Sequence, residues 1–326
     1  MTDRPLAVRG IILMSLSAAV MFSFLGSARL WDRDEPRNAR AAHEMLERGD
    51  WVVPTFNGEL RSHKPAMLYW LQMSAYALLG QSEFTARLPS AIAALISVLS
   101  IAWLGSRLAG ERSAVGPTGF WTGSVLATFA LFVMAGRAAT PDSCLIACST
   151  AGIAALVGGL LIAPAERSRL ATSILLERLS WRWATLGYMA LGGALLAKGP
   201  VGLILPLLIV HTWWLVMQRR RPEAHELPRA RLGRLAVRTW VIVNPRHVWR
   251  SVIALKTLPG VCIALLVAAP WYIAVGLATD GEFLRDFLWQ HNVGRAVASM
   301  EGHRGSILFY PAALLVGTFP WSLWLI

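Results

Sequence analysis

The chain has 326 residues, of which 55% are hydrophobic and 15% are charged, and its formal net charge is +12. Together with a mean hydropathy of +0.50, this composition excludes an ordinary soluble globular protein and indicates an integral membrane protein. The basic surplus would also fit nucleic-acid binding, but ten Lys and Arg residues lie together in 219–256, between two apolar stretches. A basic loop beside anionic lipid explains this position better, so we expect no nucleic acid among the partners.

Long apolar stretches without charged residues follow one another along the chain. They cover residues 10–28, 88–106, 113–136, 143–165, 183–197, 199–218, 257–279 and 305–326. Most are close to the ~20 residues with which a helix crosses ~30 Å of hydrocarbon. The sequence therefore predicts an all-α integral membrane protein whose single domain, 1–326, is a polytopic bundle of about eight spans.

The charged residues sort by side when these stretches cross in turn from an inner N-terminus. The inner segments then hold 18 Lys or Arg and 6 Asp or Glu, and the outer segments hold 13 of each kind. The inner segments in this arrangement are 1–9, 107–112, 166–182 and 219–256. The whole net charge of +12 thus lies inside, as the positive-inside rule requires, and the clustered carboxylates lie outside. We expect the functional site on the outer face.

The first stretch, 10–28, follows two arginines and ends in small residues, which is also the pattern of a cleaved signal sequence. Cleavage would leave the long loop after it without an anchor, so we interpret the stretch as a span. The three cysteines, Cys144, Cys148 and Cys262, lie in apolar stretches without metal-binding spacing and are interpreted as small buried hydrophobes.

The first outer loop, 29–87, is the longest, and its middle carries a helix signal. Residues 36–46 begin with proline and are rich in alanine, and Gly49 follows as a stop. Residues 65–82 are also uncharged, but they open with a proline and have only about fourteen apolar residues before Gly80. If they crossed the membrane, every later loop would change sides and the charge sorting would be lost. We therefore predict a helix lying in the outer interface.

The second outer loop, 280–304, contains an amphipathic run at 282–292. Phe283, Phe287 and Leu288 are predicted to lie on one side of this run.

Charged motifs gather at the predicted outer ends of the spans. They are the run Trp31–Arg37, which includes Asp34-Glu35-Pro36-Arg37, then His63-Lys64-Pro65, the run Arg137–Asp142, Lys198-Gly199-Pro200 and the run Trp289–Arg295. Each has a plain structural explanation by itself: Asp34 and Glu35 would stabilise a helix start, and Lys198 would extend from a span end to water. Together they form a rim of carboxylates and cations. Transfer from a phosphate-linked lipid needs such a rim, with cations for the leaving phosphate and a carboxylate for the attacking acceptor.

The stretch DEPRNARAAHEMLERGDWVVPTFNGELRSHKP, residues 34–65, resembles the first periplasmic loop of bacterial polyprenyl-phosphate-dependent glycosyltransferases of the GT-C type. The likeness is to the lipid A aminoarabinose transferases and related undecaprenyl-phosphate-sugar transferases in particular, and more distantly to the protein O-mannosyltransferases. Further matches lie at Asp142, at Lys198-Gly199-Pro200 and in FLWQHNVGRAV, residues 287–297, so the resemblance covers nearly the whole chain. The family implies a GT-C-like helical bundle with an interfacial helix after the Lys-Pro. The family's C-terminal soluble domain is expected to be absent from these residues.

The resemblance implies a role for each matching residue. Asp34 matches the essential aspartate of the first loop and Asp142 matches the second acidic position, so both are expected to be catalytic. Positions that hold the lipid phosphate are matched by Arg37, Lys64 and Arg295. The substrate site is further expected to include Glu35, Tyr69 and Lys198.

A metal is also implied by the resemblance. His291 matches a histidine that helps to bind a metal in the aminoarabinose transferases, where a glutamate precedes the Lys-Pro of the first loop. This chain has His63 at that place instead. His63 and His291 together can supply ring nitrogens to zinc, so a divalent cation, zinc or magnesium, is the candidate cofactor.

The sequence therefore predicts a multi-pass glycosyltransferase of the cell inner membrane with its active site facing the periplasm. An acceptor oxygen would attack the anomeric carbon of a polyprenyl-phosphate sugar and invert its configuration. Asp34 would be the general base for a hydroxyl acceptor or an orienting group for a phosphate acceptor. The expected partners are this donor, membrane lipids, and a lipid, glycan or protein acceptor.

Two alternatives stay open at this point, a lipid or solute transporter such as a flippase and a non-catalytic membrane scaffold. Transporters usually carry ionisable residues near the bilayer midplane, where this sequence has only His211. A scaffold would not explain the clustered outer motifs.

Overall fold

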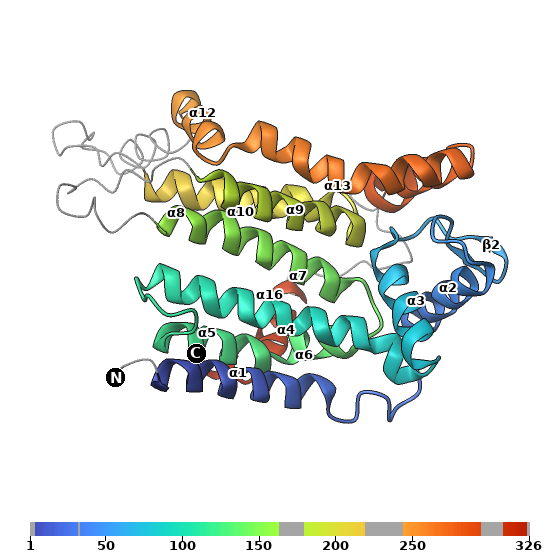
Figure 1. Ribbon diagram of the computed structural model, residues 1–326, viewed down its shortest axis with the longest axis horizontal. Helices are drawn as coiled ribbons and strands as arrows, with labels where there is room; N and C mark the ends of the chain where they lie inside the picture. The colour runs from blue at the N-terminus through green and yellow to red at the C-terminus, as the bar shows by residue number, and fades with distance from the viewer. Residues whose placement is uncertain (1–3, 32, 163–178, 219–243, 295–308, 325–326) are drawn as a thin grey trace.

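The computed structural model describes residues 4–31, 33–162, 179–218, 244–294 and 309–324. Long helices run side by side in an elongated bundle (Figure 1). In chain order they are α1 (Arg4–Phe22), α4 (Glu83–Leu108), α5 (Pro117–Thr128), α6 (Ala130–Arg137), α7 (Asp142–Ile153), α9 (Trp181–Lys198), α10 (Val201–Met217) and α13 (Thr257–Ala278). Shorter elements continue or join them: the π-helical turn η1 (Ala154–Gly158), α8 (Gly159–Leu161) and α12 (Pro245–Ala254). The predicted all-α membrane bundle is confirmed.

Several of these helices are long and apolar enough to cross a membrane. They are α4, the continuous pair α7 and α8, and α13, and α5 with α6 forms a further, bent candidate. Two shorter apolar helices, Val8–Phe22 and Val201–Met217, lie beside them. In Figure 1 the N-terminus and α12 lie at one end of the bundle, and α2 and α3 lie at the other, which we call the outer end. The chain alternates between these ends as the charge sorting predicts.

α5 and α6 meet at an angle of 68°, where the sequence predicts one uninterrupted stretch. Phe129 is extended between them, and the N–H of Ala130 donates to the carbonyl of Phe319 at 3.0 Å. The indole N–H of Trp321 closes the same break by donating to Thr128 Oγ1 at 2.8 Å. The bend therefore depends on contacts with a distant segment, and neither proline nor glycine stands at the break to predict it.

The last predicted stretch, 305–326, is not one continuous span in its described part. α16 (Phe309–Gly317) is followed by a 3-10 turn, η5 (Trp321–Trp324). Pro320 lies between them and has no N–H with which to continue a helix. The prediction of a single span is wrong for these residues, and the remainder of the stretch lies outside the described residues.

The first outer loop begins with α2 (Asp34–Arg48), which covers the predicted helix. Gly49 ends it with a φ of 64°, and the Gly49 N–H donates to the carbonyl of Leu46 at 3.0 Å. This left-handed end is the glycine stop that the sequence predicts. An antiparallel two-stranded ribbon follows, with β1 (Thr55–Phe56) paired to β2 (Glu59–Leu60).

α3 (Met67–Leu79) corresponds to the predicted interfacial helix at 65–82. Its 13 residues are about 20 Å long, too short to cross ~30 Å of hydrocarbon. It lies beside α2 at the outer end of the bundle, and Gly80, with a φ of 79°, turns the chain back toward α4 (Figure 1). This length agrees with the prediction that the segment does not cross.

The second outer loop contains α14 (Glu282–Arg285) and the π-helical segment η4 (Asp286–Gly294) in its described part. Phe283 and Phe287 are buried, as predicted, but Leu288 is 42% exposed. Leu288 directly follows Phe287 in the π-helical segment, and its side chain points away from the buried side.

Close helix packing holds α9 in the middle of the bundle. Gly192 of α9 faces α13, where a Cβ atom would lie 2.7 Å from the carbonyl oxygen of Ala264. Small residues permit this close approach in membrane proteins. Tyr188 is fully buried nearby and donates to the carbonyl of Leu255 at 3.2 Å. This packing fixes α9 and, at its outer end, Lys198.

Candidate active site at the outer end of the bundle

Asp34 is the first residue of α2, and its side chain is exposed. Asp34 therefore lies in the first turn of α2, at the positive end of the helix dipole. Its charge also acts on Tyr69: burial raises the pKa of the Tyr69 phenol, and the negative charge of Asp34 raises it further. Asp34 is therefore accessible to a substrate at the outer end of the bundle.

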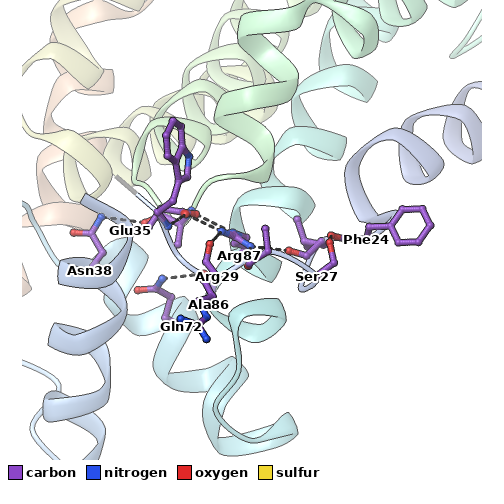
Figure 2. A network of polar contacts seen from close by, with 12 residues as sticks. Phe24, Ser27, Arg29, Glu35, Asn38, Gln72, Ala86 and Arg87 are labelled. Carbon is purple, nitrogen blue, oxygen red and sulfur yellow. Dashed lines mark hydrogen bonds and ion pairs between the residues drawn. The ribbon is translucent and has the colours of Figure 1, made fainter. Parts of the chain in front are cut away.

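Glu35 is the next residue but is buried, with only 2% of its surface exposed. Its carboxylate accepts two hydrogen bonds from Arg87, at 2.9 and 2.8 Å, one from the Ala139 N–H at 2.7 Å and one from the Trp31 N–H at 3.0 Å (Figure 2). Burial alone raises the pKa of the Glu35 carboxyl, but these hydrogen bonds and the Arg87 charge hold it below its ordinary value. A buried carboxylate with four donors has a structural role, but Glu35 also lines a cavity beside Asp142, so its expected substrate contact stays a prediction.

Tyr69 is likewise expected in the substrate site, and the structure places it in the core beneath α2 instead. It is fully buried, and its hydroxyl accepts a hydrogen bond from Arg61 Nε at 3.0 Å. Arg61 Nη2 donates to Asn38 Oδ1 at 3.0 Å, and Asn38 Nδ2 donates to the carbonyl of Ala139 at 3.0 Å. These bonds tie the ribbon, α3 and α2 to the loop before α7, so Tyr69 supports the site from below.

Asp142 and Lys198 form an ion pair between the outer ends of α7 and α9. Asp142 lies in the first turn of α7 and Lys198 in the last turn of α9, each at the helix end whose dipole favours its charge. Their side chains are 44% and 32% exposed. The structure thus brings two predicted site residues together and leaves both accessible.

An apolar cavity of about 420 Å³ lies on one side of α7. Its walls come from α3, α4, α7 and α9 and include Leu71, Ala75, Ile92, Ala147 and Cys148. Two of its lining residues lie close in sequence to predicted site residues. Cys144 follows Asp142 by two residues, and Met67 follows Lys64 by three. This cavity can take a hydrocarbon chain that ends among the outer charges.

A second, larger cavity of about 910 Å³ lies on the other side of α7. Its polar groups come from Asp142, Arg137, Thr140 and the Glu35–Arg87 pair. Residues of α6 and α16 such as Leu131 and Leu314 give it apolar walls. Asp142 therefore lines this mixed cavity. Cys144, two residues further along α7, lines the apolar cavity.

The remaining predicted residues are placed only in part. Arg37 and Lys64 are half-buried in the first outer loop, and His63 is exposed. Arg295 and the side chain of His291 lie outside the described residues, so the phosphate cluster and the histidine pair stay predictions. Within the described side chains, no group of three or more His, Cys, Asp or Glu is arranged to hold a metal ion.

Two arginines at the outer end were given no role of their own by the sequence, although Arg137 opens one of the predicted charged motifs. Arg87 donates to the Glu35 carboxylate, as described above. Arg137 donates to the carbonyls of Val20 and Ser23, at 2.6 and 2.7 Å, where α1 ends. Each arginine stands at the boundary of a predicted apolar stretch. This position gives a usable signal, because a guanidinium at a span end readily binds free carbonyls.

The bundle has the fold of a solved membrane glycosyltransferase of the GT-C class. The crystal structure of ArnT from Cupriavidus metallidurans bound to undecaprenyl phosphate matches with a TM-score of 0.65 and 22% sequence identity, over 96% of this chain and 49% of that one. ArnT in the apo state matches with a TM-score of 0.68 and 22% identity, over 97% of this chain and 49% of that one. Residues 11–274 match the dolichyl-phosphate-mannose-protein mannosyltransferase family. The chain belongs to this family.

Curated relatives agree with this assignment. The undecaprenyl phosphate-α-4-amino-4-deoxy-L-arabinose arabinosyl transferase of Pectobacterium carotovorum is 27% identical over 96% of this chain. The transferase of the same name from Yersinia pestis is 28% identical, also over 96% of this chain. This chain spans 48% of the length of each of them. The expected resemblance to GT-C glycosyltransferases and the multi-pass membrane character are confirmed.

Proposed function

We propose that this chain forms the membrane part of an inverting glycosyltransferase that uses a polyprenyl-phosphate sugar. One observation carries the proposal: an accessible Asp142–Lys198 pair lies at the outer end of α7, beside one apolar and one mixed cavity. Asp34 lies exposed at the same end of the bundle. Membership of the mannosyltransferase family and the names of the curated relatives support the same reaction class.

The donor is proposed to lie with its prenyl chain in the apolar cavity and its phosphate among the outer cations. Ala197, the residue before Lys198, packs in one cluster with Cys144 and Ala147 of the cavity wall. Met67 of the same wall lies three residues after Lys64. Arg37 and Arg295 are the other proposed phosphate ligands, on the family resemblance. Guanidinium and ammonium groups stabilise the negative charge that develops on a departing phosphate.

The reaction is proposed to proceed by direct displacement. An acceptor oxygen bonds to the anomeric carbon while the bond from that carbon to the phosphate oxygen breaks, and polyprenyl phosphate leaves with the electron pair. Asp34 accepts the proton when the acceptor is a hydroxyl, and Asp142 holds the sugar or acceptor beside it. When the acceptor is a phosphate, no proton is removed and Asp34 only orients it. Should the His63 and His291 ring nitrogens bind zinc, the ion would add positive charge near the phosphate.

The transporter alternative is not favoured by the deep polar groups that the structure describes. His211 in α10 has both ring nitrogens engaged, Nδ1 with Ser251 Oγ at 2.8 Å and Nε2 with Thr257 Oγ1 at 3.0 Å. A histidine held in this way joins helices, whereas transport pathways place ionisable groups along a route through the bilayer.

The site is proposed to face the periplasm from the inner membrane, with a lipid, glycan or protein as acceptor. Single cysteines at the exposed positions Gln81 and Arg112 test the orientation in a variant without the three native cysteines. An impermeant thiol reagent added to intact cells with a permeable outer membrane should label position 81 and not position 112. The reverse pattern would place the site in the cytoplasm.

Mass spectrometry tests the activity itself. Envelope lipids, glycans and proteins from cells with the gene, without it, and with Asp34→Asn should differ by one sugar on one acceptor. The purified full chain with undecaprenyl-phosphate-linked 4-amino-4-deoxy-L-arabinose and extracted membranes should release undecaprenyl phosphate. Identical envelopes in all three strains, with no release from any polyprenyl-phosphate sugar tried, would reject the proposal.

A further inference from the structure

Glu35 is a junction between three segments that are distant in sequence. Its two carboxylate oxygens bind Arg87 of α4, the backbone of Trp31 before α2, and the backbone of Ala139 in the loop before α7 (Figure 2). Arg87 and Glu35 are both buried, with side chains 7% and 3% exposed. Both are held by hydrogen bonds to several backbone groups, and both also line the mixed cavity beside Asp142.

The loop before α7 is also bound through its carbonyl groups. The carbonyl of Ala139 accepts from Asn38 Nδ2 at 3.0 Å, and the carbonyl of Thr140 accepts from Ser90 Oγ at 3.2 Å. Asp142 begins α7 two residues after Thr140. Both the N–H and the C=O of Ala139 are thus bound to side chains of α2, the helix that Asp34 begins.

We infer that Glu35 and Arg87 are positioning residues that set the separation between Asp34 and Asp142. The inference rests on the proposed function, in which these two carboxylates act on one substrate. Asp34 precedes Glu35 directly, and Ala139 lies three residues before Asp142, so a shift at the junction moves the two carboxylates relative to each other. A displacement of about 1 Å can lower a reaction rate ~10²-fold, because the reacting groups must be aligned.

Glu35→Gln is the variant that disturbs this junction with the least change in volume. Glutamine has one acceptor oxygen and one NH₂ group, so the NH₂ must face donors of Arg87, Trp31 or Ala139. At least one bond to the loop or to α4 is lost, while the side chain keeps its length. Neither Asp34 nor Asp142 is altered.

Glu44 provides a matched control on the same helix. It is 7% exposed and accepts hydrogen bonds from Thr55 Oγ1 at 2.7 Å, the Asn57 N–H at 2.8 Å and Arg40 at 2.9 Å. All these partners lie within the first outer loop, and none belongs to the segment before α7. Glu44→Gln therefore perturbs an equally buried carboxylate without touching the proposed junction.

The first measurement is a kinetic comparison of the full chain and its Glu35→Gln and Glu44→Gln variants. Release of undecaprenyl phosphate from the aminoarabinose donor is followed with extracted membranes as acceptor. We expect kcat to fall about 10- to 100-fold in Glu35→Gln with little change in donor KM, since alignment and not donor binding is lost. Glu44→Gln should keep kcat close to that of the parent. Equal losses of kcat in the two variants, or a rise in donor KM alone, would overturn the inference.

The second measurement does not depend on activity. Spin labels at Pro36 and Ala138, in a variant without the native cysteines, report the distance between α2 and the loop before α7 in lipid nanodiscs. The distance distribution should be narrow in the parent and in Glu44→Gln and broad or shifted in Glu35→Gln. An unchanged distribution in Glu35→Gln would overturn the inference. If the labels respond as expected but the parent transfers no sugar, the proposed function fails and the junction stands.

A milder variant covers the case in which Glu35→Gln does not fold. Ser90→Ala removes only the hydrogen bond to the Thr140 carbonyl and leaves the Glu35–Arg87 pair intact. A smaller fall in kcat with a broader label distance supports the junction, and an unchanged kcat with an unchanged distance contradicts it.

Discussion

Two of the ion pairs at the outer end of this bundle, Glu35–Arg87 and Asp142–Lys198, differ in burial and in the groups that they join. Glu35–Arg87 is buried and engaged with backbone groups of three segments. Asp142–Lys198 is half-exposed and joins only two helix ends beside the two cavities. A buried pair is costly to disturb, whereas an exposed pair adds little stability and can exchange its partner for a substrate. On this comparison we expect the exposed carboxylates to act on the substrate and the buried one to support them.

The largest effect is expected at Asp34, the exposed neighbour of Glu35. Asp34→Asn should lower transfer about 10²- to 10⁴-fold, the usual contribution of a general base. Stability should change by at most ~1 kcal/mol, the size of a lost interaction with a helix dipole. Undecaprenyl-phosphate release and denaturation in detergent measure the two effects. A variant with near-parental transfer would leave Asp34 a helix-stabilising residue and make Asp142 the first candidate.

Arg87→Ala tests the buried pair by its effect on folding. The variant leaves the Glu35 charge buried without its cation, so we expect a loss of about 3–5 kcal/mol in the free energy of unfolding. The melting temperature and the yield of folded protein in detergent check this. A loss below ~1 kcal/mol would mean that the pair behaves like an exposed one and that the comparison fails.

Lys198→Ala tests the exposed pair, with the opposite balance of effects. Stability should change by only ~0–1 kcal/mol, as for other exposed ion pairs. Donor KM should rise about tenfold, equivalent to ~1.4 kcal/mol of lost binding to the lipid phosphate. Unchanged donor KM would remove Lys198 from the proposed phosphate site.

The pH dependence of stability gives the smallest and finest test. The pKa of Glu35 is lower in the folded protein than its ordinary value, so its stabilising contribution is complete above that ordinary value. The contribution is lost as the pH falls through the lowered folded pKa. Thermal unfolding between pH 7 and pH 3 should therefore show a steeper acid loss in the parent than in Glu35→Gln, which has no such group to protonate. Equal slopes would contradict the lowered pKa.

Local signals predicted much of the outer loop, because they depend on residues close in sequence. Pro36 and Gly49 bound α2 within two residues, and the short apolar run at 65–82 predicted a helix that does not cross. The charge sorting gave the direction of the helices. These features require no knowledge of which segments meet.

The role of each acidic residue could not be predicted in the same way. Asp34 and Glu35 are adjacent and chemically alike, yet only the packing of Arg87, 52 residues away, shows which one is buried. The start of α4 was missed for the same reason. The predicted stretch, 88–106, was ended at charged residues, so it left out the buried Arg87, whereas α4 begins at Glu83. Tyr69 also changed from an expected ligand contact to a core residue once Arg61 was seen to bind its hydroxyl.

The bend between α5 and α6 has a consequence for how the protein is made. In hydrocarbon, an amide without an acceptor costs several kcal/mol, so Ala130 needs the Phe319 carbonyl to complete the break. The two sides of this contact are far apart in the chain, because Trp321 lies 193 positions after Thr128. During synthesis the hydrogen bonding at the break between α5 and α6 is therefore incomplete until the later segment is present. The later segment has to be synthesised before the contact between Ala130 and Phe319 can form.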